Sequence, residues 1–369
     1  MKHDTLLRAA AVQAVASDGA VHLLPADCPD WIVLGGTARL IWERLEYPAT
    51  VADIATKLSV DYDAPLERIR QDVASLAAEL LRRGVLAECS DSPDALRNRY
   101  LFLLKRALGN LLYPELELQM QHLERGAGGL GGAELRRYQR DISLHEAEGF
   151  AGLLAAKLQG TGPPRHPHTM IGHFRLSNIE RCAERVISDG VPGDFLEAGV
   201  CKGGASIFMR ALQLALGSPE RRTWVVDSFA GCPSSEAPVD AAYDLHLEES
   251  RLPWLACSED QVREHFRRYD LLDANVRFVA GWLADSVPTA GIGPLAILRI
   301  DVDLYSSTSQ CLDLLYDNVS QGGFVIVDDY GFLECCRDAV DDFRRQRGIE
   351  EPIRWIDGSG IYWRKGEGS

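Results

Sequence analysis

No stretch of this 369-residue chain contains about 18 consecutive apolar residues, so the sequence offers no candidate for a membrane-spanning helix. The first residues also lack the apolar segment and small-residue cleavage site of a secretory leader, and we therefore expect a cytoplasmic protein. None of the nine cysteines belongs to a Cys-x-x-Cys pair. An odd number of cysteines in a long chain predicts reduced thiols rather than a disulfide framework.

Basic residues are too few for a typical nucleic-acid-binding protein. The chain has 39 Lys and Arg against 54 Asp and Glu, which gives a formal net charge of -15. Contact with a phosphate backbone requires a basic face. Residues 66–88 hold the helix best placed to read DNA, yet they balance four arginines against four acids. We therefore predict no nucleic-acid partner, and a DNA-binding regulator is the least favoured function.

The dinucleotide-binding fingerprint Gly-x-Gly-x-x-Gly is also absent at the place where a nucleotide-type turn occurs. A short apolar strand there ends at Glu197, and Gly199, Gly203 and Gly204 precede a helical stretch over residues 207–214. An acid that opens such a turn suits the cationic amino group and sulfonium of S-adenosylmethionine, which has no pyrophosphate. The glycines could admit a ligand or only tight strand-to-helix packing, and both explanations stay open.

Acids stand at the ends of the strands that follow. The strand over residues 223–227 ends in Asp227, the strand over 295–300 precedes Asp301, and the strand over 322–327 precedes Asp328 and Asp329. Open α/β sheets bind ligands at the carboxyl ends of their parallel strands, and an acid in the place of Asp227 contacts ribose hydroxyls.

Asp301, Asp328 and Asp329 form the sharpest group, because their two strands should be neighbours. Carboxylates so close together repel one another unless a cation joins them, and an all-oxygen ligand set suits Mg²⁺ or a similar ion. Such an ion lowers the pKa of a bound hydroxyl and orients it for attack on a methyl group. The competing interpretation is that one or two acids cap helices, as Asp303 could do for a helix that starts near Ser306.

The first 95 residues have a different pattern, with three short strands followed by three helices. Asp18-Gly19 predicts a hairpin turn, and residues 31–34 predict the third strand. Thr37 is the expected N-cap of the first helix, while Thr50 and Asp53 predict a capping box for the second. We expect a small winged-helix-type α+β domain.

The motifs of this domain resemble the PqqD-like family. They are Thr37-Ala-x-x-Ile41-Trp42-x-x-Leu45, Thr50-Val-x-x-Ile54-Ala-x-x-Leu58 and Leu80-Leu-x-x-Gly84-Val-Leu86. The resemblance implies a recognition element that binds a leader peptide as an added strand. Its peptide-binding residues would be Trp31, Ile32, Val33 and Leu34 on the third strand and Ile69, Arg70 and Val73 on the third helix. The alternative is a dimerisation or packing module without a peptide partner.

Residues 96–168 separate this domain from the catalytic domain that we expect over residues 169–369. They predict helices and a glycine-rich tract over 126–132. That tract could form a lid over the substrate or an inert linker, and the sequence does not decide between them.

A second resemblance covers about residues 98–365 and points to the macrocin (TylF-like) O-methyltransferases. The motifs are Thr169-Met-Ile-Gly172, Gly193-Asp-Phe-Leu-Glu197, Gly203-Gly-Ala-Ser206, Val226-Asp-Ser-Phe229, Gly281-Trp282, Asp301-x-Asp303-Leu-Tyr305 and Gly322-Gly-Phe-Val-Ile-Val-Asp-Asp-Tyr-Gly331. The resemblance implies a class I Rossmann-like methyltransferase fold that uses S-adenosylmethionine and Mg²⁺. Its implied cofactor contacts are Thr169, Met170, Ile171, Gly172, Glu197, Gly199, Gly203, Ser206, Asp227, Ser228 and Asp285. Its implied metal ligands are Asp301, Asp328 and Asp329.

The proton acceptor is less well defined. Asp301 could serve, and His246 lies in a variable segment near the place of a family histidine, although a solvated loop histidine is the competing interpretation. Catechol-type relatives carry a lysine where this chain has Leu304. The family pattern more often has a glycine where this chain has Cys232, a departure that we expect to be harmless.

The two resemblances together predict a fusion enzyme that methylates an oxygen on a ribosomally made precursor peptide held by its leader. The alternative is O-methylation of a sugar or another small hydroxylated natural product, with a purely structural first domain. A third possibility is a binding protein that keeps the fold without turnover, against which the intact acids argue. The TylF-like resemblance also implies a homo-oligomer, a dimer or larger.

Overall fold

The chain forms two units in the computed structural model. It describes residues 7–9, 12–17, 19–25, 32–45, 49–60, 62, 64–83, 85–88, 93–112, 167–233, 239–240 and 256–366. Met1–Leu103 form the first unit and Leu104–Ser369 the second.

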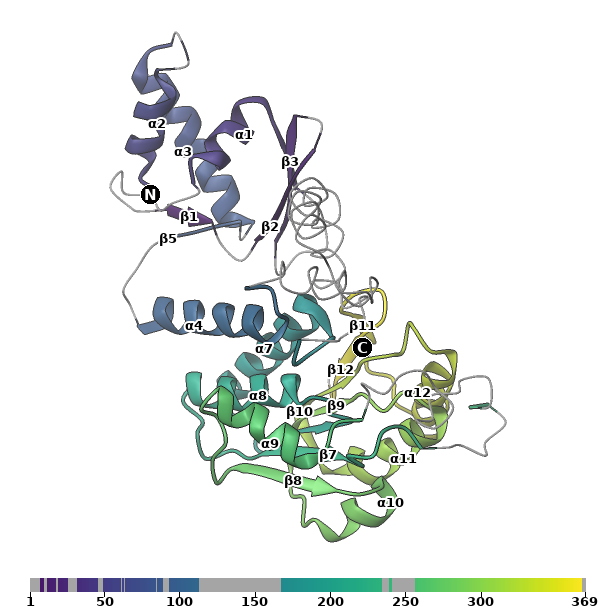
Figure 1. Ribbon diagram of the computed structural model, residues 1–369. Coiled ribbons are helices and arrows are strands. Elements are labelled where there is room, and N and C mark those ends of the chain that lie inside the picture. The colour runs from purple at the N-terminus through teal and green to yellow at the C-terminus, as the bar shows by residue number, and fades with distance from the viewer. Residues whose placement is uncertain are drawn as a thin grey trace, which may run out of the picture. The chain divides into compact units, whose positions relative to one another are not determined.

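Antiparallel strands and three helices make up the first unit (Figure 1). The elements are β1 (Leu7–Ala9), β2 (Val12–Ser17), β3 (Ala20–Pro25), β4 (Ile32–Gly35), α1 (Gly36–Glu43), α2 (Val51–Leu58), α3 (Leu66–Arg82) and β5 (Leu86–Glu88). β2, β3 and β4 form one antiparallel sheet in that order, and β1 pairs with β5 in another. This is an α+β arrangement, and the finer winged-helix assignment stays a prediction.

The sequence predicted the N-caps of α1 and α2, and the structure confirms one of the two. Thr50 accepts a hydrogen bond from the backbone N–H of Asp53, and Asp53 accepts one from the N–H of Thr50, so the predicted capping box is confirmed. The prediction for Thr37 was wrong, because the N-cap of α1 is Gly35, two residues earlier, and glycine has no side chain to offer.

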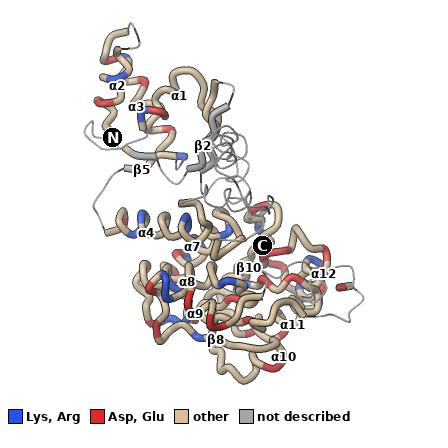
Figure 2. Tube along the Cα trace, viewed as in Figure 1, with Lys and Arg blue, Asp and Glu red and all other residues tan. Residues whose placement is uncertain are grey.

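Charges of both signs lie on the helices of this unit, as Figure 2 shows for α2 and α3. On α3, Arg70 pairs with Glu67, and Arg82 and Arg83 pair with Glu79. These three arginines are thus balanced by acids one turn away in the sequence.

A seven-stranded sheet with helices on its faces makes up the second unit (Figure 1). Its longer elements are α4 (Pro93–Leu108, shared with the first unit), α7 (Gly172–Ser188), β6 (Asp194–Ala198), α8 (Gly204–Ala215), β7 (Thr223–Asp227), α9 (Glu259–Arg268), β8 (Val276–Ala280), α10 (Leu283–Ser286), β9 (Leu295–Ile300), α11 (Tyr305–Leu315), β10 (Val319–Val327), α12 (Glu334–Arg347), β11 (Arg354–Trp355) and β12 (Ile361–Arg364). The strand order is β11-β12-β10-β9-β6-β7-β8.

The central strands β10, β9, β6, β7 and β8 are parallel to their neighbours, and β12 runs antiparallel to β10. All six residues of β9 are buried, as expected for a strand covered on both faces. The backbone N–H of Asp301 donates to the carbonyl of Ala198, and that of Asp328 donates to the carbonyl of Ile300. The ends of β6, β9 and β10 therefore lie side by side, as predicted. None of the helices in the described ranges could cross a membrane.

Candidate active site

The glycine turn between β6 and α8 is shaped by close packing within the protein. A Cβ atom at Gly199 would lie 1.8 Å from the carbonyl oxygen of Asp301, and one at Gly204 would lie 2.3 Å from the carbonyl oxygen of His168. Gly203 has φ +83°, and a Cβ there would lie 2.6 Å from Cγ1 of Val262. Close packing within the protein is thus a sufficient reason for these glycines, and their predicted contacts with a cofactor stay predictions.

Replacing Gly203 with alanine should therefore lower the free energy of unfolding by about 1–3 kcal/mol, because alanine is strained at positive φ. The added methyl group would also displace Val262 or the turn, so we expect a higher KM for the methyl donor. Chemical denaturation and steady-state kinetics measure the two effects. Gly217→Ala is the matched control, since it has φ +76° and open space around its Cβ position. An equal rise of KM in Gly217→Ala would contradict the explanation that displacement of the glycine turn weakens binding of the methyl donor.

The segment before α7 lies against this turn. The carbonyl oxygen of His168 accepts a hydrogen bond from the N–H of Gly204, and the carbonyl of Leu108 accepts from the N–H groups of His168 and Thr169. Ile171 and Gly172 are buried, and Thr169 and Met170 are half-buried. The structure thus places His168 and Thr169 against Gly204, and the predicted cofactor contacts of residues 169–172 stay predictions.

Asp227 joins the glycine turn to the end of β7. One carboxylate oxygen accepts hydrogen bonds from the N–H groups of Val200 (2.7 Å) and Cys201 (3.3 Å), and the other accepts from the N–H of Phe229 (2.7 Å). Burial raises the pKa of Asp227, and these three donors oppose that rise. Ser228 donates to the carbonyl of Gly231, while Asp285 lies exposed on α10. Their cofactor contacts stay predictions.

Glu197 is buried beneath the turn, with both of its oxygens held by protein groups. Arg299 donates to one oxygen at 2.6 Å, and the hydroxyl of Ser206 donates to the other. Burial raises the pKa of Glu197 to about 7, and the charge of Arg299 opposes the rise. Glu197 and Ser206 thus support the turn from below, and direct contact with a cofactor stays a prediction for both.

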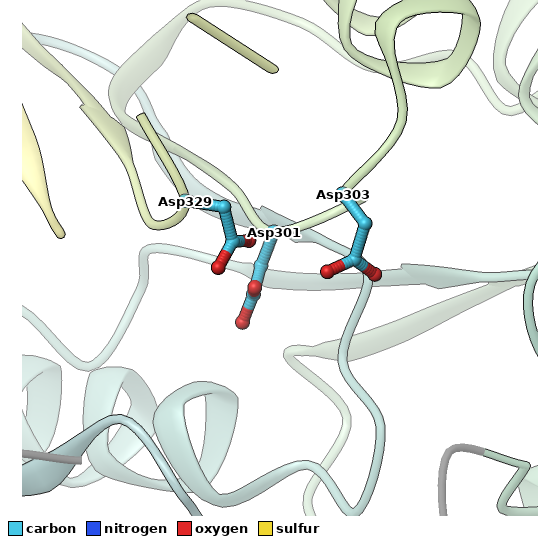
Figure 3. A group of neighbouring side chains, drawn as sticks. All are labelled: Asp301, Asp303 and Asp329. Carbon is cyan, nitrogen blue, oxygen red and sulfur yellow. The ribbon is translucent and has the colours of Figure 1, made fainter. Parts of the chain in front are cut away.

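Three carboxylates gather at the ends of β9 and β10. Asp301, Asp303 and Asp329 each place an oxygen within 4.8 Å of the others, and Figure 3 shows the three side chains directed to the same side. Burial first, and neighbouring carboxylates second, raise the pKa of each, to about 7 for Asp303. Oδ2 of Asp329 is buried and has no hydrogen-bond partner among the described residues. This group could hold a cation.

The structure differs from the predicted ligand set at one position. Both oxygens of Asp328 accept hydrogen bonds from arginines, one from Arg299 and one from Arg175. Asp303 stands with Asp301 and Asp329 instead. It does not cap α11, because Asp240 accepts hydrogen bonds from the N–H groups at the start of that helix. Asp328 as a metal ligand stays a prediction.

Two arginines form a buried network under the acids, and sequence reasoning missed both. Arg299 in β9 has no exposed surface and donates to Glu197, Asp301 and Asp328. Arg175 on α7 donates to Asp328 and, at 2.9 Å, to Asp357. One signal was available, since an arginine inside an otherwise apolar buried strand requires charged partners.

The remaining predicted residues fall into two groups. Leu304 is buried. The thiol of Cys232 donates to Asp303 at 3.7 Å, so the residue that replaces the usual glycine of the family lies in contact with the acid group. His246, Trp31 and the glycine-rich tract lie outside the described residues.

A mostly parallel sheet, a glycine turn after its central strand and carboxylates at the strand ends define a class I α/β methyltransferase. The family model described as Macrocin-O-methyltransferase (TylF) matches residues 97–365. The chain therefore belongs to this family and is an S-adenosylmethionine-dependent O-methyltransferase of natural-product tailoring. Residues 21–86 match the model described as Coenzyme PQQ synthesis protein D (PqqD).

Named relatives agree with this assignment. The chain is 42% identical over 271 residues to the 8-demethyl-8-(2,3-dimethoxy-alpha-L-rhamnosyl)-tetracenomycin-C 4'-O-methyltransferase of Streptomyces olivaceus, covering 73% of this chain and 93% of the relative. It is 41% identical over 241 residues to the mycinamicin III 3''-O-methyltransferase of Micromonospora griseorubida, covering 63% and 94%. The solved structure of the O-methyltransferase NovP is 38% identical, with a TM-score of 0.61, and the match covers 73% of this chain and 100% of NovP.

Proposed function

We propose that this enzyme transfers the methyl group of S-adenosylmethionine to a hydroxyl group on the sugar of a glycosylated natural product. The observation that carries the proposal is the group Asp301, Asp303 and Asp329 at the strand ends beside the glycine turn. The relatives support the sugar, since one is named for a 4'-oxygen on a rhamnosyl tetracenomycin and another for a 3''-oxygen of mycinamicin III. This is the alternative that the sequence offered beside a peptide substrate.

The residues around the turn fit S-adenosylmethionine. Asp227 offers carboxylate oxygens between the turn and β7, where ribose hydroxyls could donate to them, and the acids at the neighbouring strand ends suit a cationic ligand. The turn at Gly199 and Gly203, the residues 169–172 and Asp285 would complete the site. The cofactor supplies an electrophilic methyl group on its sulfonium, and the protein orients an acceptor oxygen toward it.

The acids also fit a hard divalent cation such as Mg²⁺. The donors are all oxygens, and the buried, unpartnered Oδ2 of Asp329 is an atom that a ligand would satisfy. Asp301, Asp303 and Asp329 would hold the ion, with Asp328 the further predicted ligand. The ion supplies Lewis acidity that lowers the pKa of a hydroxyl. Asp301 or Asp303 would accept the proton that the hydroxyl loses.

Removal of divalent ions with a chelator should therefore abolish turnover, and added Mg²⁺ should restore it. In the ion-free enzyme the pKa values of the three acids should stay raised. Added Mg²⁺ should lower these pKa values, and NMR or infrared spectroscopy of the carboxyl groups measures the change. Full activity in chelator, together with unchanged carboxyl titration, would contradict the cation site.

Mass spectrometry of reactions with a panel of rhamnosides and other glycosides tests the sugar acceptor. We expect a gain of one methyl group on the sugar, with no peptide required. Methylation confined to a precursor peptide would overturn the proposed acceptor and leave the enzyme class unchanged.

A leader-guided peptide is the second candidate, and the match of residues 21–86 to the PqqD model favours it. β4 pairs only with β3 among the described strands, so its other edge could accept an added strand. Val33 on β4 is 57% exposed, whereas Ile69 and Val73 on α3 are buried in the core of the unit, and Arg70 pairs with Glu67. Main-chain pairing along β4 would therefore contribute more to binding than the predicted α3 side chains.

Fluorescence anisotropy with the full-length enzyme measures this binding directly. A labelled leader peptide of a candidate precursor should bind at micromolar or lower concentration, and Val33→Pro should weaken this binding at least tenfold by removing a main-chain donor of β4. Val60→Pro, at an exposed position after α2, is the control. Absence of binding by the wild-type enzyme would remove the peptide candidate.

A further inference from the structure

Two large exposed aromatic side chains of the methyltransferase unit lie on the turn that follows Asp329 and on the strand β11, and the function proposed above does not use them. Phe332 is 75% exposed and Trp355 is 56% exposed. With Tyr330 they form what we call the aromatic shelf. Ligand-binding sites commonly combine exposed aromatic side chains with a few polar groups.

The shelf begins at the acid group itself. Tyr330, Gly331 and Phe332 directly follow Asp329, and the N–H of Phe332 donates to the carbonyl oxygen of Asp329 at 3.0 Å. The rings of Tyr330 and Trp355 meet edge to face, with centroids 5.6 Å apart. A Cβ atom at Gly331 would lie 2.8 Å from the Trp355 ring, so the glycine lets the indole pack onto this turn.

Polar contacts fix the segment that carries Trp355 to the same strand end. The Ser359 hydroxyl donates to the carbonyl oxygen of Asp328 at 2.8 Å, and the carbonyl of Ser359 accepts from the N–H of Gly331 at 2.8 Å. Arg175 also bridges Asp357 and Asp328. The Trp355 ring is therefore held against the turn that follows Asp329, and the Tyr330 hydroxyl donates to Asp341 at 2.9 Å, so these two rings have the preorganisation that a binding site needs.

We infer that the aromatic shelf binds a flat apolar ring face of the acceptor while one hydroxyl of the acceptor reaches the acids. Aromatic rings stack on such faces, and the face could belong to the sugar ring or to an aromatic ring of the aglycone. This subsite rests on the proposed function, since it identifies the acceptor of that reaction as a ring-bearing glycoside.

Steady-state kinetics of Phe332→Ala and Trp355→Ala test the subsite. Each variant should raise KM for the acceptor about tenfold, the size expected for one lost stacking contact, and leave kcat and the KM for S-adenosylmethionine within about twofold. Trp355→Phe should keep most of the affinity. Leu214→Ala, which removes an exposed apolar side chain at the far end of α8, should change nothing.

Three acceptors distinguish the two sources of the ring face: a free sugar, its alkyl glycoside and its aryl glycoside. An equal rise in KM for all three assigns the sugar face to the shelf, and a rise for the aryl glycoside alone assigns the aglycone. Unchanged KM values in both alanine variants, with a wild-type enzyme that methylates glycosides, would overturn the shelf and leave the proposed function intact. A wild-type enzyme that neither binds nor methylates any glycoside would overturn both.

Discussion

Replacing Arg299 with methionine should lower the free energy of unfolding at pH 7 by about 3–5 kcal/mol, the cost of removing one partner from a buried ionic network. Arg299 has no exposed surface, and its guanidinium donates to Glu197, Asp301 and Asp328. Methionine would fill a similar volume but leave three carboxylates without their shared cation. Urea denaturation measures the loss. Arg299→Lys keeps the charge without the branched donors and should recover only part of it.

The free energy of unfolding that Arg299→Met loses should increase with pH. Burial raises the pKa of Glu197 from 4.5 to about 7 while Arg299 lowers it, so without Arg299 the folded-state pKa rises further. A carboxyl group with a raised folded-state pKa stabilises the fold below its unfolded value, and that contribution is lost as the pH rises through the folded value. The deficit of the variant should thus be smaller at pH 4.5 than at pH 7, and it should grow further as the pH rises above 7.

Arg277→Met, at an exposed position on the edge strand β8, is the matched control, and we expect a change within about 0.5 kcal/mol at either pH. An Arg299 variant as stable as this control would show that the buried network contributes nothing.

Replacing Asp301 with asparagine should lower kcat by about two to four orders of magnitude, the range associated with loss of a positioned proton acceptor. Asp301 is both a member of the acid group and the residue that joins it to Arg299, at 2.8 Å. Asparagine can still accept that hydrogen bond through its carbonyl oxygen, so the fold should survive. Single-turnover kinetics with saturating donor would isolate the chemical step.

Asp313→Asn, at an exposed position on α11, serves as the control and should retain wild-type turnover. Asp303→Asn tests whether Asp303 also accepts the proton. If this variant, which keeps Asp301, loses its activity, proton acceptance would be assigned to Asp303. Wild-type kcat in Asp301→Asn would contradict the role given to the acid group.

The sheet and the acid group were largely predictable because buried parallel strands are apolar runs and their carboxyl ends meet at one edge. Asp301 and Asp329 follow such runs, so their proximity could be inferred without coordinates. The capping box at Thr50 and Asp53 was predictable for a similar reason, since its partners are three residues apart.

The contacts that the sequence did not reveal join residues far apart in the chain. Arg299 meets Glu197 over a separation of 102 residues, and Asp240 reaches the N–H of Tyr305 over 65. No local pattern pairs such residues, so the sequence could not show that Asp240 caps α11 in place of Asp303, or that arginines pair with both oxygens of Asp328. The same limit applies to Gly199 and Gly204, whose neighbours are backbone atoms of Asp301 and His168.

Transfer of a ¹³C-methyl group from S-adenosylmethionine to a glycoside acceptor, followed by NMR of the product, tests the central claim most directly. The account predicts a labelled methoxy carbon correlated to one sugar ring carbon, formed by the wild-type enzyme and lost in Asp301→Asn. A label on nitrogen or carbon, or a labelled methoxy group formed at the wild-type rate by Asp301→Asn, would contradict it.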